Sequence, residues 1–413
     1  MVERGRCSVP HMVTQSLPGP PTHARILVAG GGNGGIALAA RLHRLGEDDI
    51  VIVEPRAEHH YRPLLSYVGA GLAAIDSARR PQGRVMPSGC VWVRDAIAGV
   101  DPEASQVVLA SGATIGYDHL VVAAGSRPDW DAIDGSAEAM HTQNASTNYL
   151  FDLAPKTWRL VQGMRSGTAV FTMPDDSCPC AGASQKILYM ACDLWRSRGV
   201  LEDIRVVAVV PTDTVFGVPG VDEELERKID EYGIELRTRT RIQSLHRDTG
   251  TAVLDNDGVL EELDYDFLHL TPPHAAPRWV AASGLSSVTA RGFVDVDPET
   301  LQHRRYPNVW AVGDIAATPG SSSGGALRKQ TPVVAKNIRS ALNDKAPRAR
   351  YNGYTVSPFT VSRSTLVLAE FAPDGTPMPS TRLFELRKER ALTFLLDRWL
   401  LPQIYWHRIL RGK

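Results

Sequence analysis

The sequence has few cysteines, almost no net charge and no long apolar run. No stretch approaches the ~18 consecutive apolar residues that a membrane-spanning helix needs. The formal net charge of −1 gives no indication of a nucleic-acid partner. The five cysteines are an odd number in a chain of 413 residues, which argues against a secreted disulfide scaffold and favours a reducing compartment. No His/Cys cluster has metal-ligand spacing, so we expect no metal site.

What is present favours a multidomain α/β protein. A chain of 413 residues exceeds one ordinary core, and two or three domains are expected. Residues 1–22 hold several prolines and no apolar core of the signal-peptide type, so we expect a disordered tail. Domains are expected at 23–150 together with 285–345, at 151–284 and at 346–413. Apolar runs predict strands at 25–29, 50–53, 91–94, 106–109, 117–124, 168–172, 205–210, 267–270 and 309–312, and helices at 36–45, 184–196 and 222–232.

A glycine-rich turn near the N-terminus has the spacing of a dinucleotide-binding site. Residues 30–35 (GGGNGG) fit the pattern G-x-G-x-x-G and lie between a predicted strand and a predicted helix. Glycine there allows a tight turn and close approach of the backbone to pyrophosphate, which then meets the helix N-terminus. The next strand ends at Glu54, whose carboxylate can bind ribose hydroxyls. The predicted contacts are Gly30, Gly32, Asn33, Gly35 and Glu54.

Two later motifs favour FAD over NAD. Residues 117–126 (YDHLVVAAGS) resemble the Y-D-x-L-V-x-A-x-G-S segment of flavin disulfide-reductase-like enzymes. Residues 308–314 (NVWAVGD) resemble their second FAD motif, in which a strand-end aspartate contacts the ribityl–pyrophosphate region. The resemblance implies FAD as cofactor and two Rossmann-like α/β domains of the glutathione-reductase-like kind. It adds Ala124, Gly125, Gly313 and Asp314 to the predicted site.

The second half has thiols where a pyridine-nucleotide enzyme would have a second glycine-rich turn. After the strand at 168–172, residues 173–182 (MPDDSCPCAG) contain no such pattern, and two carboxylates there would repel a pyrophosphate. This argues against NAD(P)H as electron donor. Cys178 and Cys180 stand in its place. A thiolate can hold sulfane sulfur as a persulfide and pass two electrons to a flavin, aided by a helix N-terminus and by the charge of Lys186.

Several segments resemble type II sulfide:quinone oxidoreductases. Residues 180–189 (CAGASQKILY) are similar to that family's C-A-G-A-P-Q-K-I-x-Y segment, and residues 300–309 (TLQHRRYPNV) to its T-L-Q-H-x-x-Y-P-N-V run. Residues 328–337 (RKQTPVVAKN) resemble its segment near the flavin and quinone. The resemblance implies that sulfide is oxidised at a redox cysteine, Cys180, and that electrons pass through FAD to a membrane quinone. Lys329 and Gln330 then lie at the flavin, where Lys329 stabilises the anionic reduced form.

One position departs from this family. Its second redox cysteine lies in a G-Y-T-x-C-P segment, which reads GYTVSP here and puts Ser357 in the cysteine's place. A hydroxyl can neither form a disulfide nor carry a persulfide. Either Cys178 acts as a displaced partner, or the chain uses one cysteine or another substrate. A direct bond between Cys178 and Cys180 would close a small strained ring and is not assumed.

Two other functions stay open beside sulfide oxidation. One is a type-II NADH dehydrogenase-like enzyme, against which the missing second glycine turn argues. The other is a catalytically impaired homologue that binds FAD and sulfane sulfur as a carrier or sensor, which the Ser357 replacement motivates. The expected partners are sulfide, a membrane quinone, a sulfane-sulfur acceptor and a lipid bilayer surface; a homodimer is left open.

The C-terminal region predicts attachment to a membrane surface. Its apolar residues at helical spacing are Leu392, Leu395, Leu396, Trp399 and Leu400. Basic residues surround them, including Arg398, and Pro402 is expected to end the segment. Tyr405 and Trp406 add an aromatic end. Such a segment suits insertion into one leaflet, so we expect a peripheral protein on the cytoplasmic face of a bacterial inner membrane. The alternative is an ordinary helix packed on the core.

The remaining histidines and cysteines give weaker signals. His59 and His60 are expected in a solvated loop rather than a site. Cys192 falls on the helix after the cysteine-bearing loop and is expected in the core. Cys90 precedes a strand and is expected to be structural, and Cys7 lies in the tail.

Overall fold

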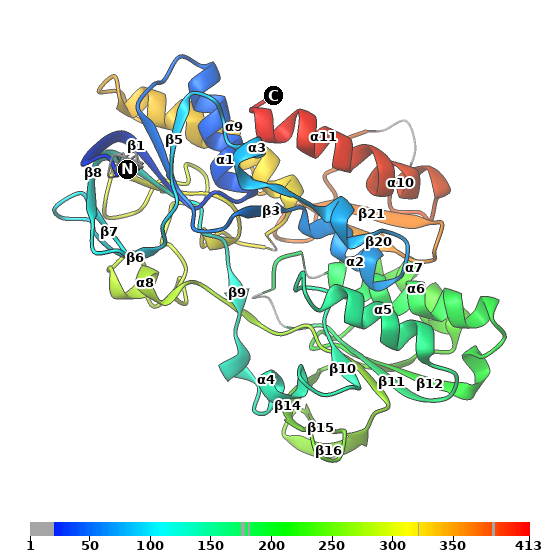
Figure 1. The fold of residues 1–413 in the computed structure, drawn as a ribbon. Helices are drawn as coiled ribbons and strands as arrows, with labels where there is room; N and C mark the ends of the chain where they lie inside the picture. The colour runs from blue at the N-terminus through cyan, green and yellow to red at the C-terminus, as the bar shows by residue number, and fades with distance from the viewer. Residues whose placement is uncertain (1–19, 175–177, 181, 321, 382–384) are drawn as a thin grey trace, which may run out of the picture.

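Two α/β units and a C-terminal segment make up the protein (Figure 1). The computed structural model describes residues 20–174, 178–180, 182–320, 322–381 and 385–413. Most of the predicted tail, with Cys7, lies outside these ranges, as do residues 175–177 and Ala181 of the cysteine-bearing loop.

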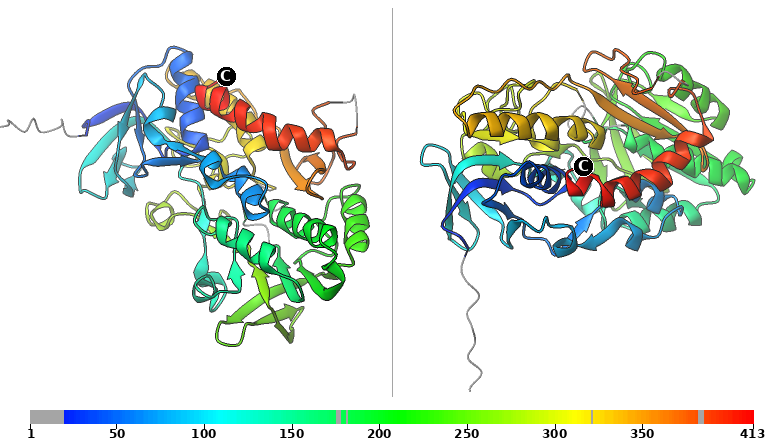
Figure 2. Two further views of the ribbon diagram at one scale, coloured as in Figure 1. Left: turned by 45° about the vertical axis from the view of Figure 1, so that its right-hand side comes forward. Right: turned by 90° about the horizontal axis from the view of Figure 1, so that it is seen from above.

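The first unit is a seven-stranded sheet of order β5-β2-β1-β8-β7-β6, with β19 paired to β8. Its strands are β1 (His23–Ala29), β2 (Ile50–Val53), β5 (Cys90–Val93), β6 (Ile97–Asp101), β7 (Gln106–Leu109), β8 (Thr114–Val122) and β19 (Val309–Ala311). Helices α1 (Asn33–Arg44) and α9 (Gly324–Ala341) pack against each other beside it (Figure 1, Figure 2). The central strands are parallel and almost wholly buried, which is why they read as continuous apolar runs.

The second unit is a five-stranded parallel sheet of order β10-β17-β11-β12-β13. Its strands are β10 (Ala145–Ser146), β11 (Gly167–Thr172), β12 (Ile204–Val209), β13 (Glu235–Arg237) and β17 (Phe267–His269). Its helices are α5 (Ala154–Gly163), α6 (Ala183–Ser197) and α7 (Asp222–Tyr232). A separate antiparallel sheet consists of β14 (Thr240–His246), β15 (Thr251–Asn256) and β16 (Val259–Asp264).

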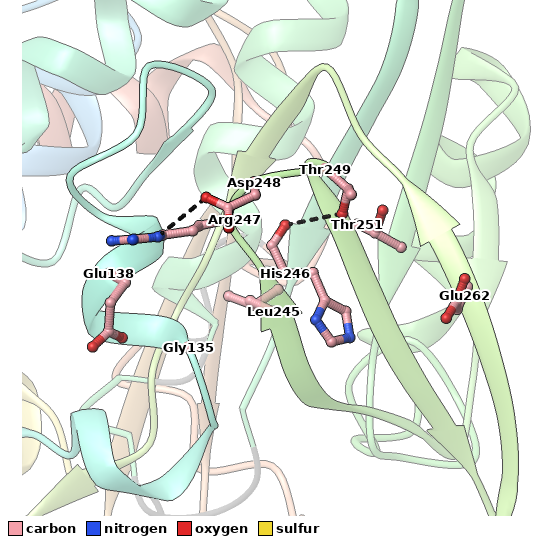
Figure 3. A pocket seen from close by; sticks show the side chains of 9 residues that line it. All are labelled: Gly135, Glu138, Leu245, His246, Arg247, Asp248, Thr249, Thr251 and Glu262. Atoms are coloured by element: carbon pink, nitrogen blue, oxygen red, sulfur yellow. Dashed lines mark hydrogen bonds and ion pairs between the residues drawn. The ribbon is translucent and has the colours of Figure 1, made fainter.

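An open hollow of about 540 Å³ lies against this antiparallel sheet (Figure 3). Its lining consists of Gly135, Glu138, Leu245, His246, Arg247, Asp248, Thr249, Thr251 and Glu262. None of these is a cysteine or a residue of the predicted FAD site. The hollow is therefore not where the sequence predicts the chemistry.

The chain passes twice between the two units, and the two connections pair with each other. β9 (Arg127–Pro128) and β18 (His274–Ala275) form a two-stranded antiparallel sheet. Beside it, the N–H of Asp129 donates to the carbonyl of Pro273 at 2.8 Å. The second unit is thus an insertion in the first, whose sheet is completed by β19 after the return.

The C-terminal segment forms a hairpin and a helical run. Its elements are β20 (Thr355–Thr360), β21 (Leu366–Phe371), α10 (Ala391–Leu395), a π-helical segment (Leu396–Leu400) and α11 (Leu401–His407). The helical run, red in Figure 1, ends beside α1. There Arg44 donates to the carbonyl of Gly412 at 3.2 Å. The end of the chain therefore packs on the helix that begins at the glycine-rich turn.

Every strand and helix predicted from apolar runs is present, with bounds shifted by at most about three residues. The antiparallel sheet and α9 were not predicted. In β16, Val259 and Leu260 are 70% and 57% exposed, so apolar residues do not mark a buried face. Helix α9 begins with two glycines and contains Pro332, which obscure a helical pattern. The shorter elements are β3 (Glu58–His60), β4 (Arg79–Pro81), α2 (Leu65–Gly69), α3 (Gln82–Val85), α4 (Ser136–Ala139) and α8 (Arg278–Ala282).

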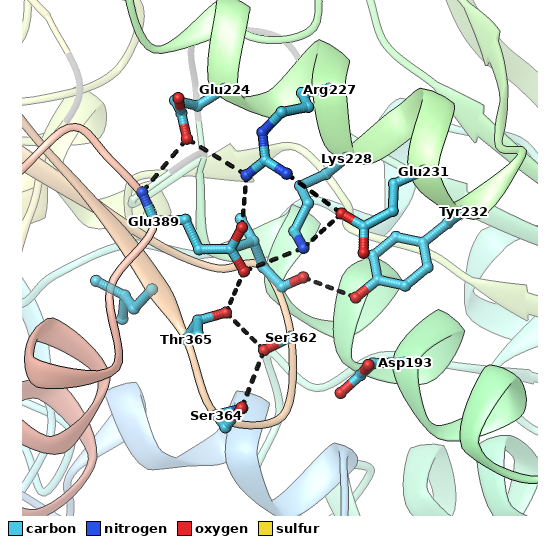
Figure 4. Close-up of polar contacts among 12 residues, drawn as sticks. Asp193, Glu224, Arg227, Lys228, Glu231, Tyr232, Ser362, Ser364, Thr365 and Glu389 are labelled. Carbon is cyan, nitrogen blue, oxygen red and sulfur yellow. Dashed lines mark hydrogen bonds and ion pairs between the residues drawn. The ribbon is translucent and has the colours of Figure 1, made fainter.

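An ionic network fastens the C-terminal segment to α7 (Figure 4). The Glu389 carboxylate pairs with Arg227 at 2.5 Å and with Lys228 at 3.0 Å, and accepts from the Thr365 hydroxyl at 2.5 Å. The Lys228 side chain is 4% exposed and also pairs with Glu231 at 2.9 Å. Burial acts to raise the pKa of Glu389, but these hydrogen bonds hold it below its ordinary value.

We expect Glu389→Gln to lower the free energy of unfolding by about 1–3 kcal/mol, because it removes the carboxylate that pairs with the buried Lys228 ammonium and with Arg227. The carboxylate's folded-state pKa is depressed, so its contribution is present above the ordinary value of 4.5 and is lost as the pH falls through the lower folded value. Urea denaturation at pH 7 and pH 3 measures both effects. The control is Glu235→Gln in an exposed pair with Arg205, expected to change stability by less than ~1 kcal/mol. Equal losses of unfolding free energy in both variants would show that Glu389 contributes no more to stability than an exposed ion pair does.

Candidate functional site

The turn after β1 brings two glycines against the backbone. Gly30 has a φ of +116°, and a Cβ there would lie 2.6 Å from the carbonyl oxygen of Ala123 and 2.9 Å from Cα of Ala124. A Cβ on Gly35 would lie 1.9 Å from the carbonyl oxygen of Gly30. Gly125 follows in the left-handed region at φ +67°. The structure therefore brings Gly30, Gly35 and Ala124 together at a close approach that only glycine permits.

The same turn offers room and polar groups to a dinucleotide. A Cβ on Gly32, which caps α1, would meet no described atom within 4 Å. Oδ1 of Asn33 is buried and has no hydrogen-bond partner in the described part of the chain. Glu54 is 3% exposed and accepts from Gly31 N–H at 2.9 Å and from Arg56 Nε at 3.0 Å. A helix N-terminus with an open approach and an orphaned acceptor fits a ligand bearing phosphates and hydroxyls.

The second FAD motif is held by α9. Gly313, with a φ of +77°, donates its N–H to Oε1 of Gln330 at 2.8 Å. Gln330 is 1% exposed, so its side chain fixes the loop that carries Asp314. Burial raises the pKa of Asp314. Lys329 lies exposed on α9, with its ammonium 5.5 Å from the ring centroid of Tyr354.

The cysteine turn, residues 178–180, is seated on two distant parts of the chain. The N–H of Cys180 donates to the carbonyl of Ser322 at 2.7 Å, and the Tyr149 hydroxyl donates to the carbonyl of Cys180 at 3.2 Å. Cys180 has a φ of +53°, a region that non-glycine residues seldom adopt. Cys178 is 2% exposed, its thiol donates to the carbonyl of Pro179 at 3.6 Å, and the Tyr149 hydroxyl acts to lower its pKa against the effect of burial. Neither cysteine forms a disulfide in the structure.

Burial governs the ionisation of Cys180. It raises the pKa of the thiol to about 11, against the opposing effects of the Lys186 ammonium and of the Ala183 N–H at the start of α6. The carboxylates of Asp397 and Asp314 raise it further. The helix N-terminus and Lys186 thus favour the thiolate, as expected, but do not overcome burial.

The cysteine turn and the second FAD motif lie within electrostatic range of each other. Burial raises the pKa of Cys178, and Asp314 acts on this thiol as it does on Cys180. Arg62 lowers the pKa values of both Cys178 and Asp314. No sequence motif marks Arg62 or Tyr149, because each acts on the turn from a segment remote in the chain.

Ser357 occupies the position that the resemblance assigns to a second cysteine. It lies on β20 and is 0% exposed. A Cβ on Gly182 would lie 3.0 Å from Cβ of Ser357, so the two residues are neighbours. The Ser357 hydroxyl has no hydrogen-bond partner among the described residues. The fold therefore presents residue 357 beside the cysteine-bearing loop, but with a hydroxyl in place of a thiol.

A buried ion pair joins α6 to the C-terminal helical run. Nζ of Lys186 lies 3.1 Å from Oδ2 of Asp397, with side chains 2% and 7% exposed. The Tyr67 hydroxyl donates to the same oxygen at 2.6 Å and lies 3.1 Å from Oγ1 of Thr360. No sequence motif marks Asp397 or Tyr67. Their polar side chains lie among apolar ones and show no recognisable spacing.

The predicted apolar face of the C-terminal run is exposed in its first half. Leu392, Leu395, Trp399 and Leu400 are 60%, 53%, 60% and 50% exposed. Burial against the core, the alternative weighed from the sequence, is wrong for these four residues. In the part of the chain described, no helix has the length and apolar character to cross a membrane, and no metal-ligating cluster is found.

Four expectations for this region and for His59 are wrong. Pro402 does not end the segment but lies in the first turn of α11, where proline's missing N–H costs no hydrogen bond. Tyr405 and Trp406 are buried, at 3% and 7% exposure, rather than facing outward. His59 is buried too and hydrogen-bonds to the Tyr405 hydroxyl; burial lowers its pKa to about 4. Arg398 points inward and donates to the carbonyl of Leu72 at 2.6 Å.

Comparison with known proteins agrees with this architecture. The model of the pyridine nucleotide-disulphide oxidoreductase family matches residues 24–341. The mitochondrial sulfide:quinone oxidoreductase of Mus musculus is 33% identical, over 94% of this chain and 87% of the relative. That of Dictyostelium discoideum is 31% identical, over 94% and 86%. The solved structure of the sulfide:quinone oxidoreductase from Aquifex aeolicus superposes with a TM-score of 0.81 at 19% identity, over 95% of this chain and 92% of that one, which shows a shared fold.

The chain therefore belongs to the pyridine nucleotide-disulphide oxidoreductase family, and its fold is that of an α/β flavoprotein. It is an FAD-dependent oxidoreductase. Its relatives include the sulfide:quinone oxidoreductases, which confirms the resemblance identified in its motifs.

We expect Gly32→Ala and Gly35→Ala to separate cofactor binding from folding. Gly35→Ala forces a Cβ into the backbone of Gly30 and should lower the melting temperature of the protein with or without FAD. Gly32→Ala has open space in the fold, so its melting temperature without FAD should match the wild type. Its affinity for FAD should fall roughly tenfold, ~1.4 kcal/mol, because the methyl group meets the pyrophosphate. Flavin fluorescence titration measures the affinity, and wild-type binding by Gly32→Ala would place FAD elsewhere.

Proposed function

We propose that this chain oxidises sulfide at Cys180 and passes the electrons through FAD to a quinone held at a membrane surface. The observation that supports the chemistry is the seating of Cys180 at a turn where Asp314, of the second FAD motif, acts on its thiol. The sulfur that is proposed to react and the predicted FAD site thus lie close enough for the charge of one to act on the other. FAD, when bound, supplies a two-electron acceptor between the sulfur and the quinone.

The residues of the chain have separate tasks in this proposal. Sulfide attacks an oxidised sulfur at Cys180, which retains the new sulfur as a persulfide. Lys186 and the N–H of Ala183 favour the anionic form of that sulfur. Gly30, Gly32, Asn33, Gly35 and Glu54 hold the dinucleotide part of FAD, and Asp314, Gln330 and Lys329 lie toward its flavin. Lys329, an exposed cation, balances negative charge gained on reduction.

We expect Cys180→Ala to lose sulfide-dependent quinone reduction by at least about a thousandfold, because it removes the sulfur on which the reaction takes place. Steady-state assays with sulfide and a soluble quinone measure the rate, and flavin absorbance before and after sulfide measures reduction directly. Cys90→Ser, in β5 of the first unit, is the matched control and should keep the wild-type rate. Equal rates in Cys180→Ala and the wild type would remove Cys180 from the reaction. Bleaching by NADH instead of sulfide would favour the NADH dehydrogenase-like alternative.

Attachment to a membrane is supported by the exposed apolar residues of the C-terminal run. Leu392, Leu395, Trp399 and Leu400 share one face and are each at least half exposed. Burying such side chains in the acyl boundary yields roughly 1.5–3 kcal/mol each when burial is complete. A quinone dissolved in the same leaflet could reach the protein without crossing water. The cytoplasmic face of a bacterial inner membrane stays part of this proposal.

We expect Trp399→Glu to weaken binding to vesicles of phosphatidylcholine and phosphatidylglycerol by at least about tenfold, because it replaces inserting apolar surface with a charge. Flotation of the purified protein with vesicles measures the bound fraction. Val288→Glu is the control, since Val288 is 96% exposed but lies far from the C-terminal run in the chain. Similar binding by both variants would show that the run does not meet lipid.

A further inference from the structure

We propose that Cys178 and Cys180 form the redox pair of this chain, and that Tyr149 is the positioning residue that holds Cys178 for this task. The inference rests on the proposed function and deepens it. It gives the second-thiol role to a residue two positions from the first, within one turn. Ser357, which is fully buried beside the loop, has no part in the electron transfer.

The location of the other thiols leaves Cys178 as the candidate. Four cysteines lie in the described part of the chain. Cys192 is on α6, nine residues after the helix begins at Ala183, so about 14 Å of helix along the axis separates it from the cysteine turn; it is 0% exposed, in the core as predicted. Cys90 begins β5 at the far edge of the first sheet. Only Cys178, among the described cysteines, shares the turn with Cys180.

Tyr149 acts on both halves of the pair. Its hydroxyl donates to the carbonyl of Cys180 at 3.2 Å, and the same hydroxyl acts to lower the pKa of the Cys178 thiol. Its ring is supported by His274, with centroids 5.7 Å apart. While Cys178 is a thiol, its S–H donates to the carbonyl of Pro179 at 3.6 Å. When Cys178 leaves as a thiolate, the single hydroxyl proton can turn to that sulfur. The contact with Tyr149 accordingly opposes the rise in the pKa of Cys178 that burial causes.

The strain in such a closely spaced pair favours the reaction. A disulfide across Pro179 closes a small ring, and strained disulfides are more readily opened by a thiolate or by sulfide. Cys180 already adopts a φ of +53°, so the turn departs from extended backbone before any bond forms. The bond would thus be an oxidant for sulfide rather than a structural link.

The cycle balances with the reactants of the proposed function. HS⁻ attacks the Cys180 sulfur of the disulfide, a persulfide forms on Cys180, and Cys178 leaves as a thiolate stabilised by Tyr149. A nucleophilic acceptor then takes the outer sulfur, which leaves Cys180 as a thiolate. Closing the disulfide releases two electrons. The quinone receives them through FAD and takes up two protons from solvent. The sum is H₂S, acceptor anion and quinone giving persulfidated acceptor and quinol.

Peptide mapping of the holoenzyme tests the pair without relying on turnover. The wild type and Cys90→Ser are oxidised with a soluble quinone under nitrogen, treated with one equivalent of sulfide or with buffer, and trapped with N-ethylmaleimide. Trypsin releases residues 166–186, which contain both cysteines of the turn. We expect this peptide unlabelled and lighter by two hydrogens after oxidation. After sulfide we expect one added sulfur and a label on Cys178. A fully labelled Cys178 after quinone oxidation would overturn the inference.

Three variants separate this inference from the proposed function. Cys178→Ser should lose quinone reduction by at least about a hundredfold while Cys180 stays alkylatable, and adding Ser357→Cys to it should restore much of the rate. Tyr149→Phe should still form the disulfide. Alkylation of Cys178 should require a higher pH than in the wild type, because the Tyr149 hydroxyl no longer lowers the pKa of this thiol. The other groups that act on the thiol, Cys180, Asp314 and Arg62, are unchanged. A wild-type rate of turnover in Cys178→Ser would show that Cys178 is not the second redox cysteine, and would leave the proposed oxidation of sulfide unaffected. If sulfide does not reduce the flavin of the wild type, the proposed function is wrong. The peptide map would still report whether Cys178 and Cys180 form a disulfide.

Discussion

The candidate site depends on how residues 178–180 are held. One hydrogen bond comes from the segment before α9, through the carbonyl of Ser322, and another from the loop after β10, through Tyr149. A cysteine in the left-handed region persists only where its surroundings fix it from several sides. The turn is therefore a product of the whole fold. Changes far from it in sequence, in either unit, can move the two sulfurs.

Burial decides which partner in the proposed reaction is the nucleophile. The pKa of Cys180 is raised to about 11, in spite of Lys186, whose charge is partly cancelled by Asp397 at 3.1 Å. A cysteine that attacks needs a thiolate at working pH, and this environment opposes one. A cysteine whose oxidised sulfur is attacked has no such need. The environment of Cys180 thus favours sulfide, rather than a cysteine thiolate, as the attacking species.

The sequence predicted the parallel sheets, the glycine-rich turn and the cysteine loop, because each is written locally as an apolar run or a fixed spacing. It did not predict β14–β16, where the apolar residues that begin β16, Val259 and Leu260, are exposed. Nor did it identify Arg62, Tyr149 or Asp397, which become neighbours of the cysteine turn only through the tertiary fold. Tyr405 and Trp406 were misplaced because an aromatic end suits a membrane and a packed core equally well; burial decided for the core.

In the C-terminal run, the exposed apolar face that is proposed to meet the membrane lies within a few residues of Asp397, which acts on the cysteine turn. Leu395 and Trp399 are four apart and share the exposed face, whereas Asp397, two residues after Leu395, lies about 200° around the helix and points inward. That inward carboxylate pairs with Lys186 and acts on the thiol of Cys180. A π-helical segment, Leu396–Leu400, includes Asp397 and Trp399, and such segments often mark functional sites. The proposed lipid contact on one side and the effect on the Cys180 thiol on the other are therefore carried by one helical run, so we expect a shift in the run to alter both.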